Sequence, residues 1–401
     1  MKHFSHLNSA AAILRQYGGR QPFHHFIKDY FRQHKKYGSK DRKSISHLCY
    51  AYFRLGPSLA TMAIEEKILL GLFLCSTRPG DLLQSLRPEW NAAVQQTVSE
   101  KCALAGIAWE QLTIFPFTGA LSEAIDTGAF VLSHLQQPDL FIRLRPGYEK
   151  SVLEKLHKAA EPYRRVNDTC IAFSNAAKID ALLELDKEAV VQDYSSQRVG
   201  EFLLLAGASA ATPVRAVWDC CAASGGKSIL AKDMLGDIRL TVSDVRKQIL
   251  VNLQQRFAAA GIKEYESFIM DLAADGRATV TTPTQTNRGT PKSSIYDLII
   301  ADAPCSGSGT WGRTPESLSF FKETEIDRYQ ALQKQVVSNA FPALKKGGCF
   351  LYITCSVFKK ENEEMVSFIE EQFQPRLVRA ELLKGYGQKA DTMFAALFIK
   401  E

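Results

Sequence analysis

Residues 216–228 read AVWDCCAASGGKS, and this stretch decides the fold that we expect for the second half of the chain. The first four residues, 216–219, are mostly apolar and predict a buried strand. Small residues and two glycines follow, and the pattern then continues as a helix. A strand that ends in a glycine-rich turn before a helix is typical of α/β domains, whose ligands lie at the carboxyl ends of the strands. We therefore expect a ligand site at this turn.

A phosphate-binding P-loop is not expected at this turn. Gly226, Lys227 and Ser228 match the end of that motif, but the motif also needs a glycine five positions before Gly226. The chain has Cys221 there. A nucleotide triphosphatase is therefore not predicted.

Strands and helices alternate through the rest of residues 201–401. Short apolar runs predict further strands at 239–244, 267–270, 295–301 and 349–353. This alternation predicts a mostly parallel sheet with helices on both of its faces. Residues 281–294 are polar and rich in turn formers, and we expect an exposed loop there.

Two smaller regions precede this domain. Residues 1–135 carry apolar side chains at helical spacing, interrupted by Pro and Gly, and predict an all-α domain. Residues 136–200 predict a small α+β unit, with short strands at 140–144 and 170–173. The sequence therefore predicts three domains, 1–135, 136–200 and 201–401.

The net charge of +6 is unevenly distributed. Residues 21–54 hold eight Lys or Arg and two Asp, an excess as large as that of the whole chain. Aromatic residues are interleaved with these charges at Phe26, Tyr30, Phe31 and Tyr37. Two interpretations stay open: a surface that follows a phosphate backbone while its rings stack on bases, or a solvated helix face whose rings belong to the core.

The composition indicates a cytoplasmic protein. No apolar run approaches the ~20 residues that a membrane-spanning helix needs, and the N-terminus lacks the continuous apolar stretch of a signal peptide. Nine cysteines, an odd number without C-x-x-C pairs, fit a reducing compartment. Their spacing predicts no metal site.

Two cysteines differ from the others because each follows a predicted strand inside a turn of small residues. Cys305 lies in DAPCSGS, residues 302–308, and Cys355 lies in TCS, residues 354–356. Both are therefore expected at the carboxyl edge of the sheet, beside the ligand site. An isolated cysteine is usually a small buried residue, which is what we expect of Cys220 and Cys349.

Carboxylates end two of the predicted strands. Asp244 can accept both ribose hydroxyls of an adenosine cofactor, and Asp271 can accept from an adenine amino group. A single Asp at a strand end is more often a helix cap. The turn at 220–226 and these two carboxylates follow successive strands, which favours a binding role.

Such a set of residues suits methylation of a pyrimidine. Carbon 5 of cytosine is a poor nucleophile, but a thiolate that adds to carbon 6 converts the ring to an enamine with a reactive carbon 5. A general acid near ring nitrogen 3 assists this addition. The base must also be unstacked, which favours single-stranded or loop RNA.

The chain resembles the RsmB/Sun family of RNA cytosine-carbon-5 methyltransferases. The likeness rests on segments that occur in the family's order: 191–197, 221–227, 302–306, 354–356 and 361–363. Residues 38–42 are similar to the RNA-binding domain of bacterial members, which resembles the NusB antiterminator. The resemblance implies a Rossmann-like class I methyltransferase domain behind a small α+β unit and an all-α NusB-like domain.

The resemblance also implies a role for each site residue. Cys355 would be the nucleophile at carbon 6, and Cys305 would assist product release. Asp302 would contact and protonate the cytosine edge, with Lys227 beside the base. S-adenosylmethionine would be held by Cys221, Ala222, Ala223, Ser224, Gly225, Gly226, Lys227, Asp244, Asp271 and Asp302.

Two positions depart from the family pattern: Ser224 stands where Pro is usual, and Ile249 stands where Arg is frequent. The neighbouring Arg246 is given no role. Ribosomal RNA is the expected substrate. A transfer RNA methyltransferase, a non-catalytic RNA-binding ribosome-assembly factor and a methyltransferase of amino groups or proteins remain alternatives. The sequence indicates neither the target cytosine nor the oligomeric state.

Overall fold

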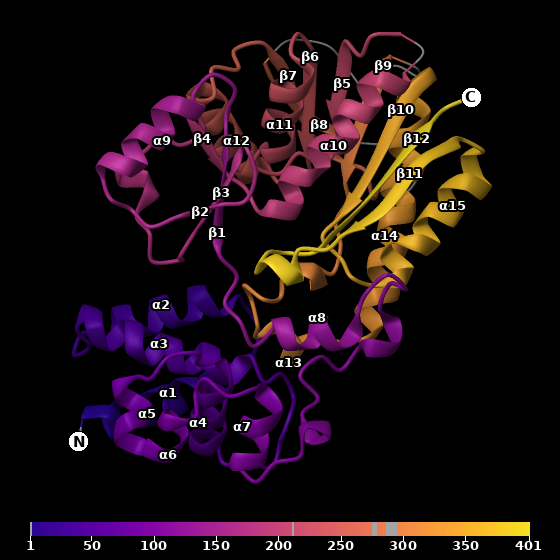
Figure 1. Cartoon of the computed structure of the whole chain (residues 1–401). Helices are drawn as coiled ribbons and strands as arrows, with labels where there is room; N and C mark the ends of the chain where they lie inside the picture. Colours follow the sequence, from indigo (N-terminus) through magenta and orange to yellow (C-terminus); the bar gives the residue numbers. More distant parts are fainter. Residues whose placement is uncertain (1, 211, 275–278, 286–294) are drawn as a thin grey trace. The chain divides into compact units, whose positions relative to one another are not determined.

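The structure, a computed structural model, describes residues 2–210, 212–274, 279–285 and 295–401. The chain divides into two units, and each draws on separate stretches of sequence (Figure 1). The first comprises Met1–Gly119, Asp126–Gln137 and Thr310–Glu323, and the second comprises Ala120–Ile125, Pro138–Gly309 and Thr324–Glu401. The three-domain division at residues 135 and 200 stays a prediction.

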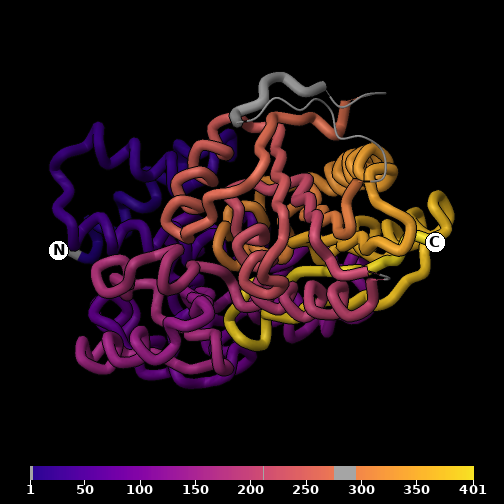
Figure 2. The backbone as a smooth tube through the Cα atoms, turned by 90° about the horizontal axis from the view of Figure 1, so that it is seen from above, coloured from indigo at the N-terminus to yellow at the C-terminus, as the bar shows by residue number. Residues whose placement is uncertain are grey.

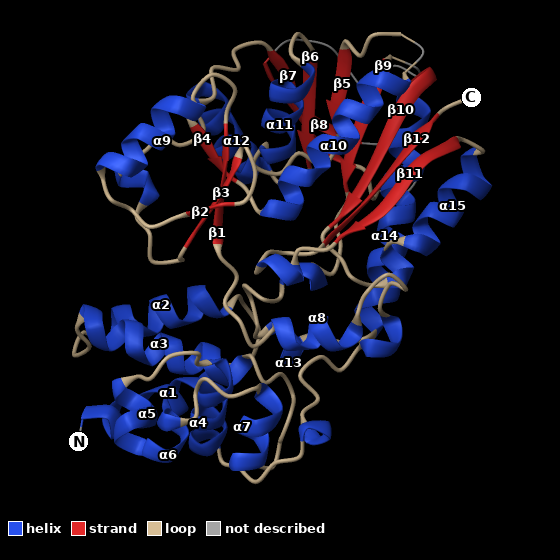
Figure 3. Ribbon diagram, in the orientation of Figure 1, coloured by secondary structure: helices blue, strands red, loops and turns tan. Residues whose placement is uncertain are grey.

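The first unit is helical over its described residues (Figure 3). Its helices are α1 (Lys2–Gln16), α2 (Phe23–Gln33), α3 (Ser39–Phe53), α4 (Ile64–Cys75), α5 (Asp81–Leu86), α6 (Pro88–Ala92), α7 (Val98–Leu104), α8 (Thr127–Ser133) and α13 (Ser317–Phe320). In α2, Phe23, Ile27 and Phe31 recur every four residues and form its buried face. Across the described chain, no helix is both long and apolar enough to cross a membrane.

The second unit contains a small antiparallel sheet of order β2-β3-β1-β4. Its elements are β1 (Leu140–Leu144), α9 (Glu149–Lys158), β2 (Arg164–Arg165), β3 (Cys170–Phe173) and β4 (Ala189–Val191). Ile142 and Leu144 of β1 point to one face, where they form a core with Val152 and Leu156 of α9. The strands expected at 140–144 and 170–173 are thus present.

The larger sheet of this unit has the order β11-β12-β10-β9-β5-β6-β7-β8. Its strands are β5 (Ala216–Asp219), β6 (Arg239–Asp244), β7 (Tyr265–Asp271), β8 (Thr279–Gln285), β9 (Tyr296–Asp302), β10 (Leu344–Thr354), β11 (Arg376–Leu383) and β12 (Met393–Ile399). The five central strands are parallel, and β8, β12 and β11 pair antiparallel at the edges. The predicted mostly parallel sheet is confirmed.

One local prediction was wrong in part. Residues 281–285, expected in a loop, belong to β8, which pairs with β7. The polar composition of this segment suits an edge strand, which needs less apolar surface than a central one. The remainder of that predicted loop, residues 286–294, lies outside the described residues.

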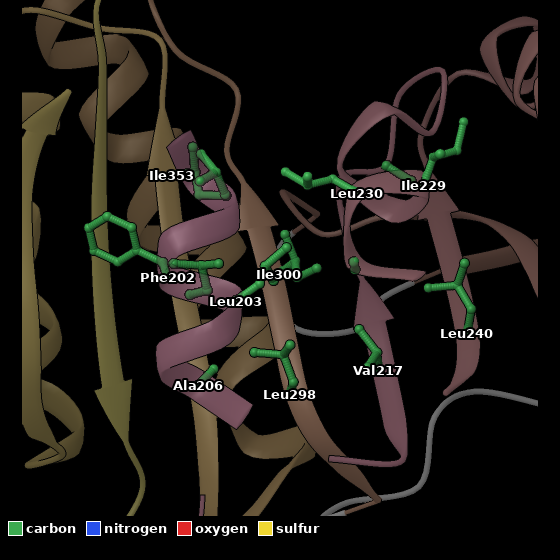
Figure 4. Close-up of a cluster of buried hydrophobic side chains, with 14 of the residues drawn as sticks. Phe202, Leu203, Ala206, Val217, Ile229, Leu230, Leu240, Leu298, Ile300 and Ile353 are labelled. Carbon is green, nitrogen blue, oxygen red and sulfur yellow. The ribbon is translucent and has the colours of Figure 1, made fainter. Parts of the chain in front are cut away.

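Helices cover both faces of the larger sheet: α10 (Tyr194–Ser209), α11 (Gly226–Leu235), α12 (Lys247–Ala259), α14 (Thr324–Ala340) and α15 (Glu363–Phe373). Phe202, Leu203 and Ala206 of α10 belong to one buried apolar cluster with residues of α11 and of the strands (Figure 4). In the view from above, α14 lies on the opposite side of the strands (Figure 2). The apolar strands are therefore buried on both faces, as parallel strands generally are.

The direction of the strand order explains where a ligand can bind. From β5 the chain moves through β6 to β7, and it then returns to β9 and β10 on the other side of β5. Right-handed crossovers consequently place α11 and α14 on opposite faces. The order reverses between β5 and β9, and ligands of open α/β sheets bind at such a reversal, beyond the carboxyl ends of the strands.

Candidate active site

Two turns at this carboxyl edge bring two thiols into contact. Cys305 follows β9 and Cys355 follows β10, and these neighbouring strands are parallel. Their sulfur atoms lie 3.2 Å apart, and both side chains are half buried. The hydrogen bond to Cys355 and burial raise the pKa of Cys305 far above its usual value. Cys305 therefore keeps its proton at neutral pH.

A buried carboxylate connects the two cysteine turns. Glu361 Oε2 accepts a hydrogen bond from the backbone N–H of Ser306 at 2.8 Å and another from Gln333 Nε2 at 3.0 Å. Its other oxygen, Oε1, accepts from Ser356 Oγ at 2.9 Å. Ser306 follows Cys305 and Ser356 follows Cys355, so one side chain holds a residue of each turn. Burial raises the pKa of Glu361.

Three serine hydroxyls fill the space between the turns. The Oγ atoms of Ser306, Ser308 and Ser356 lie 3.0–3.2 Å from one another. Ser308 Oγ also accepts from the backbone N–H of Val357 at 2.9 Å. Buried hydroxyls cost free energy unless they are hydrogen-bonded, so this network favours one arrangement of the two turns.

Gly309 allows the turns to approach closely. Its backbone N–H donates to the carbonyl oxygen of Cys355 at 2.9 Å. A Cβ atom at Gly309 would lie 1.9 Å from the carbonyl oxygen of Thr392 and 3.0 Å from that of Cys355. A side chain at this position is therefore incompatible with the observed spacing.

Lys227 and Asp302 form an ion pair at the same edge. Lys227 Nζ lies 3.0 Å from Asp302 Oδ2 and donates to Ser196 Oγ at 2.8 Å. The lysine side chain is 10% exposed and that of the aspartate is 28% exposed. The carboxylate is thus the member of the pair that is more open to a ligand.

The turn after β5 has the backbone conformation that its small residues suggest. Ala223 and Gly225 have φ angles of 45° and 84°, and Gly225 precedes the first residue of α11. A Cβ atom at Gly225 would lie 2.6 Å from the Phe257 ring, so glycine is needed there. The N-terminal amides of α11 consequently face the strand ends, where they can bind an electronegative ligand atom.

Arg256 of α12 holds Ser224 of this turn. Its Nη1 donates to both the carbonyl oxygen and Oγ of Ser224, each at 3.1 Å. Its other nitrogens bind the carboxylate of Asp186, with a shortest distance of 2.7 Å. The turn is thus connected to the segment that precedes β4.

Asp244 ends β6 beside the same turn. Its Oδ2 accepts from the backbone N–H of Ala223 at 3.0 Å, while Oδ1 accepts from the backbone N–H and Nε of Arg246, each at 2.9 Å. The hydrogen bonds to Asp244 raise the pKa of Arg246. The Arg246 side chain is 61% exposed, so it is free to move away from the carboxylate.

Two further carboxylates lie along this edge. Asp271 of β7 is two residues beyond Ile269, which pairs with Asp244, and it accepts from the backbone N–H of Ala273. Asp219 of β5 is fully buried and accepts from Ser228 Oγ at 2.6 Å. Burial raises its pKa to about 7, and within the described structure its Oδ1 has no hydrogen-bond partner.

The structure joins half of the predicted site residues in pairs: Cys305 with Cys355, Lys227 with Asp302, and Ala223 with Asp244. Asp271 is at the same edge but is held by its own turn. No role was predicted for Glu361 or Ser196, although both lie in segments that resemble the family. No local pattern indicates a role for Arg256, because its hydrogen-bond partners, Ser224 and Asp186, are distant from it in the sequence.

The basic segment 21–54 of the first unit has a mixed character. Phe31 belongs to the core, and Tyr30 and Tyr37 contact its ring. Arg54, counted with the basic residues, is buried and donates to the carbonyl oxygens of His134 and Gln136. Six of the other basic residues are exposed: Lys28, Arg32, Lys35, Lys36, Lys40 and Lys43. The ring of Phe31 thus belongs to the core, whereas the six basic side chains form a positively charged surface.

The fold and the strand-end site define the class of this protein. An open α/β sheet, a glycine-containing turn after β5 and a carboxylate after β6 form a Rossmann-like class I methyltransferase domain, which here follows a helical region. The backbone amides of the turn and the carboxylate of Asp244 are a donor and acceptor set that fits an adenosine cofactor.

Residues 209–397 match the family described as 16S rRNA methyltransferase RsmB/F. Ribosomal RNA small subunit methyltransferase B of Xanthomonas campestris is 31% identical over 228 residues, which are 52% of this chain and 47% of that protein. The probable methyltransferase B of Bacillus subtilis is 30% identical over 194 residues, 47% of this chain and 39% of that protein. The chain thus spans about half the length of the curated relatives that it matches.

Solved structures share the fold. The structure of PH0851 has a TM-score of 0.67 and 18% identity, and the match covers 100% of this chain and 98% of that one. NSun6 from Pyrococcus horikoshii, solved with SFG, has a TM-score of 0.53 and 12% identity, over 69% of this chain and 94% of that one. The predicted resemblance to the RsmB/Sun family is confirmed, and it implies S-adenosylmethionine as the cofactor.

Proposed function

We propose that this protein methylates carbon 5 of cytosine in RNA of the small ribosomal subunit, with S-adenosylmethionine as methyl donor. The observation that carries the proposal is the contact of two thiols, 3.2 Å apart, at the strand ends beside the glycine-containing turn. A pyrimidine at this edge is within reach of both thiols. The small-subunit substrate follows from the names of the relatives.

Cys355 is the nucleophile of the proposed reaction. Its thiolate adds to carbon 6 of the ring and makes carbon 5 nucleophilic. Asp302, more exposed than its partner Lys227, contacts the cytosine edge and supplies a proton at ring nitrogen 3. After methyl transfer, a base takes the carbon-5 proton, Cys355 leaves as the thiolate, and ring nitrogen 3 returns its proton to Asp302, which restores the aromatic ring. Cys305, which retains its proton, assists that departure.

The cofactor lies, in this proposal, against the turn of residues 221–226. S-adenosylmethionine supplies an electrophilic methyl group on a sulfonium centre. The turn's backbone and Lys227 hold its polar atoms together with Asp302, Asp244 accepts from its ribose, and Asp271 accepts from its adenine amino group.

We also propose separate tasks for the three sequence regions. Residues 201–401 carry catalysis, residues 136–200 link the domains, and residues 1–135 bind RNA through the exposed lysines and arginines of the basic segment. Single-stranded or loop RNA fits this scheme because the target base must leave its stack.

A Cys355→Ala variant tests the nucleophile. Its activity is measured as methyl transfer from labelled S-adenosylmethionine to small-subunit RNA of cells that lack the gene, with bisulfite sequencing to locate 5-methylcytosine. The variant should lose at least ~10⁴-fold in rate, because the covalent route is closed. Cys349→Ala serves as the matched control, since Cys349 lies buried on the same strand and away from the edge.

Undiminished transfer by Cys355→Ala would refute the assignment. A methyl group on a ring nitrogen or an exocyclic amine, located by mass spectrometry, would instead support an amino methyltransferase. Methylation of transfer RNA alone would correct the substrate, and cofactor binding without turnover on either RNA would favour a ribosome-assembly factor.

A further inference from the structure

We propose that Glu361 is the positioning residue of the thiol pair: its buried carboxylate holds the two cysteine turns together, and its charge keeps Cys305 in the thiol form while Cys355 reacts. This inference rests on the proposed function, which gives the two cysteines their separate tasks. Glu361 itself touches neither sulfur through a hydrogen bond in the described structure, so it acts through its neighbours.

The geometry supports the first half of the proposal. Glu361 lies at the end of the segment Lys359–Glu361, two residues before the start of α15, and none of its side chain reaches solvent. Three donors converge on its two oxygens, one from the Cys305 turn, one from the Cys355 turn and one from α14. A carboxylate is a pure acceptor and satisfies all three donors at once. The spacing of the sulfurs therefore depends on this side chain.

The charges around the sulfurs support the second half. The titratable groups that face Cys305 are Cys355, Glu361 and Tyr352. Glu361 faces Cys305 and Tyr352, whose hydroxyl donates to the backbone oxygen of Glu361. The hydrogen bond to Cys355 and burial are the main causes of the raised pKa of Cys305. The negative charge of Glu361 raises this pKa further. A second negative charge on Cys305 is thus disfavoured.

The proposed tasks require opposite protonation states of the two thiols. The nucleophile must lose its proton before it attacks, because only the thiolate is reactive. The second thiol is useful at the end of the reaction only if it still has a proton to give. The negative charge of Glu361 favours the protonated state of Cys305 that this task requires.

The decisive variant is Glu361→Gln, which removes the charge and keeps the shape. The amide oxygen can accept from Ser306 and Gln333, and the amide nitrogen can donate to Ser356 Oγ. Without the charge, Cys305 should ionise at a lower pH. Iodoacetamide labelling of the full-length protein, followed by peptide mass spectrometry across pH 7–10, should show Cys305 alkylated several-fold faster at pH 8 than in the wild type.

A second measurement reports the spacing without any substrate. Diamide takes two hydrogens from a pair of thiols and is reduced to a hydrazine, leaving a disulfide. In the wild type and in Glu361→Gln, Cys305 and Cys355 should link rapidly because their sulfurs are in contact. Glu361→Ala should link them at least several-fold more slowly. Ser356→Ala, which deletes the connection on the Cys355 side, replaces Glu361→Ala if that variant does not fold.

Glu364→Gln is the matched control. Glu364 is exposed near the start of α15 and binds Gln330 of α14, so it undergoes the same chemical change away from the thiols. It should leave both measurements unchanged. The proposal is overturned if Glu361→Gln has the wild-type labelling profile of Cys305, or if the alanine variant forms the disulfide as fast as the wild type. Neither readout uses RNA, so failure here is distinct from failure of the methylation proposal.

Discussion

The sulfur atoms of Cys305 and Cys355 are 3.2 Å apart although fifty positions separate them in the sequence. They meet because β9 and β10 are adjacent parallel strands, whose carboxyl ends emerge at one edge of the sheet. A single pyrimidine at that edge can be approached by one thiol and released with the help of the other. The contact is therefore the basis for assigning the two cysteines different steps.

Replacement of Cys305 by Ala should trap the reaction after methylation. Cys355 can still add to the base, but its departure lacks the assistance of the second thiol. A covalent protein–RNA adduct should accumulate and appear as a slowly migrating band on a denaturing gel. The band should be absent from a variant that also carries Cys355→Ala. A Cys305→Ala variant that turns over normally without an adduct would contradict the release role.

The buried carboxyl of Asp219 predicts a pH-dependent stability difference. Its folded pKa of about 7 lies above the ordinary value of 3.8. Well below pH 3.8 the folded and unfolded chains both hold this proton, and as pH rises towards 7 only the unfolded chain loses it readily. Asp219 therefore lowers the free energy of unfolding progressively across this range, by roughly 4 kcal/mol at most above pH 7.

Asp219→Asn lacks that titration and should lose less stability between pH 4.5 and pH 8 than the wild type. Urea unfolding followed by tryptophan fluorescence measures the difference, because Trp218 is buried in the same strand. Asp237→Asn, whose side chain is 94% exposed in the wild type, should follow the wild-type pH profile. Parallel profiles for the wild type and Asp219→Asn would count against the raised pKa.

Arg256→Gln should weaken cofactor binding because it releases the turn at Ser224. The substitution removes the hydrogen bonds to Ser224 and the ion pair with Asp186. We expect a three- to tenfold higher Kd for S-adenosylhomocysteine, about 1 kcal/mol, measured by titration calorimetry. Arg198→Gln is the control, because Arg198 is equally exposed and forms an ion pair with Glu201 away from the turn. If both variants bind S-adenosylhomocysteine with the same Kd, Arg256 does not contribute to cofactor binding.

Local patterns in the sequence were sufficient to predict the central strands and the turns that follow them. Residues 216–219 and 239–244 form strands with the expected bounds, and apart from Arg239 all of these residues are buried. The positions of Cys305 and Cys355 followed from the same patterns. Their contact required only that the two strands be neighbours in the sheet.

What the sequence left out depends on contacts between distant residues. Glu361 is polar and precedes a helix, so nothing in its own segment predicts complete burial between two turns. Arg54 looks like part of a basic surface until its guanidinium is seen bound to backbone carbonyls. The edge strand β8 has little apolar pattern because its residues need not form a core. These features arise from tertiary packing, which a single sequence does not encode locally.

Arg246 should compete with the cofactor rather than hold it. Its side chain donates through Nε and Nη2 to both oxygens of Asp244, the acceptor expected for the ribose hydroxyls. Because Arg246 is exposed, its ion pair is worth ~1 kcal/mol or less, and Arg246→Ala should tighten S-adenosylhomocysteine binding about two- to fivefold. Asp244→Asn should instead weaken binding, since the amide is a poorer acceptor for two hydroxyls. Titration calorimetry at low and high salt distinguishes the cases, because salt should diminish the gain from Arg246→Ala by screening the wild-type ion pair. Weaker binding by Arg246→Ala would show that the arginine belongs to the cofactor site itself.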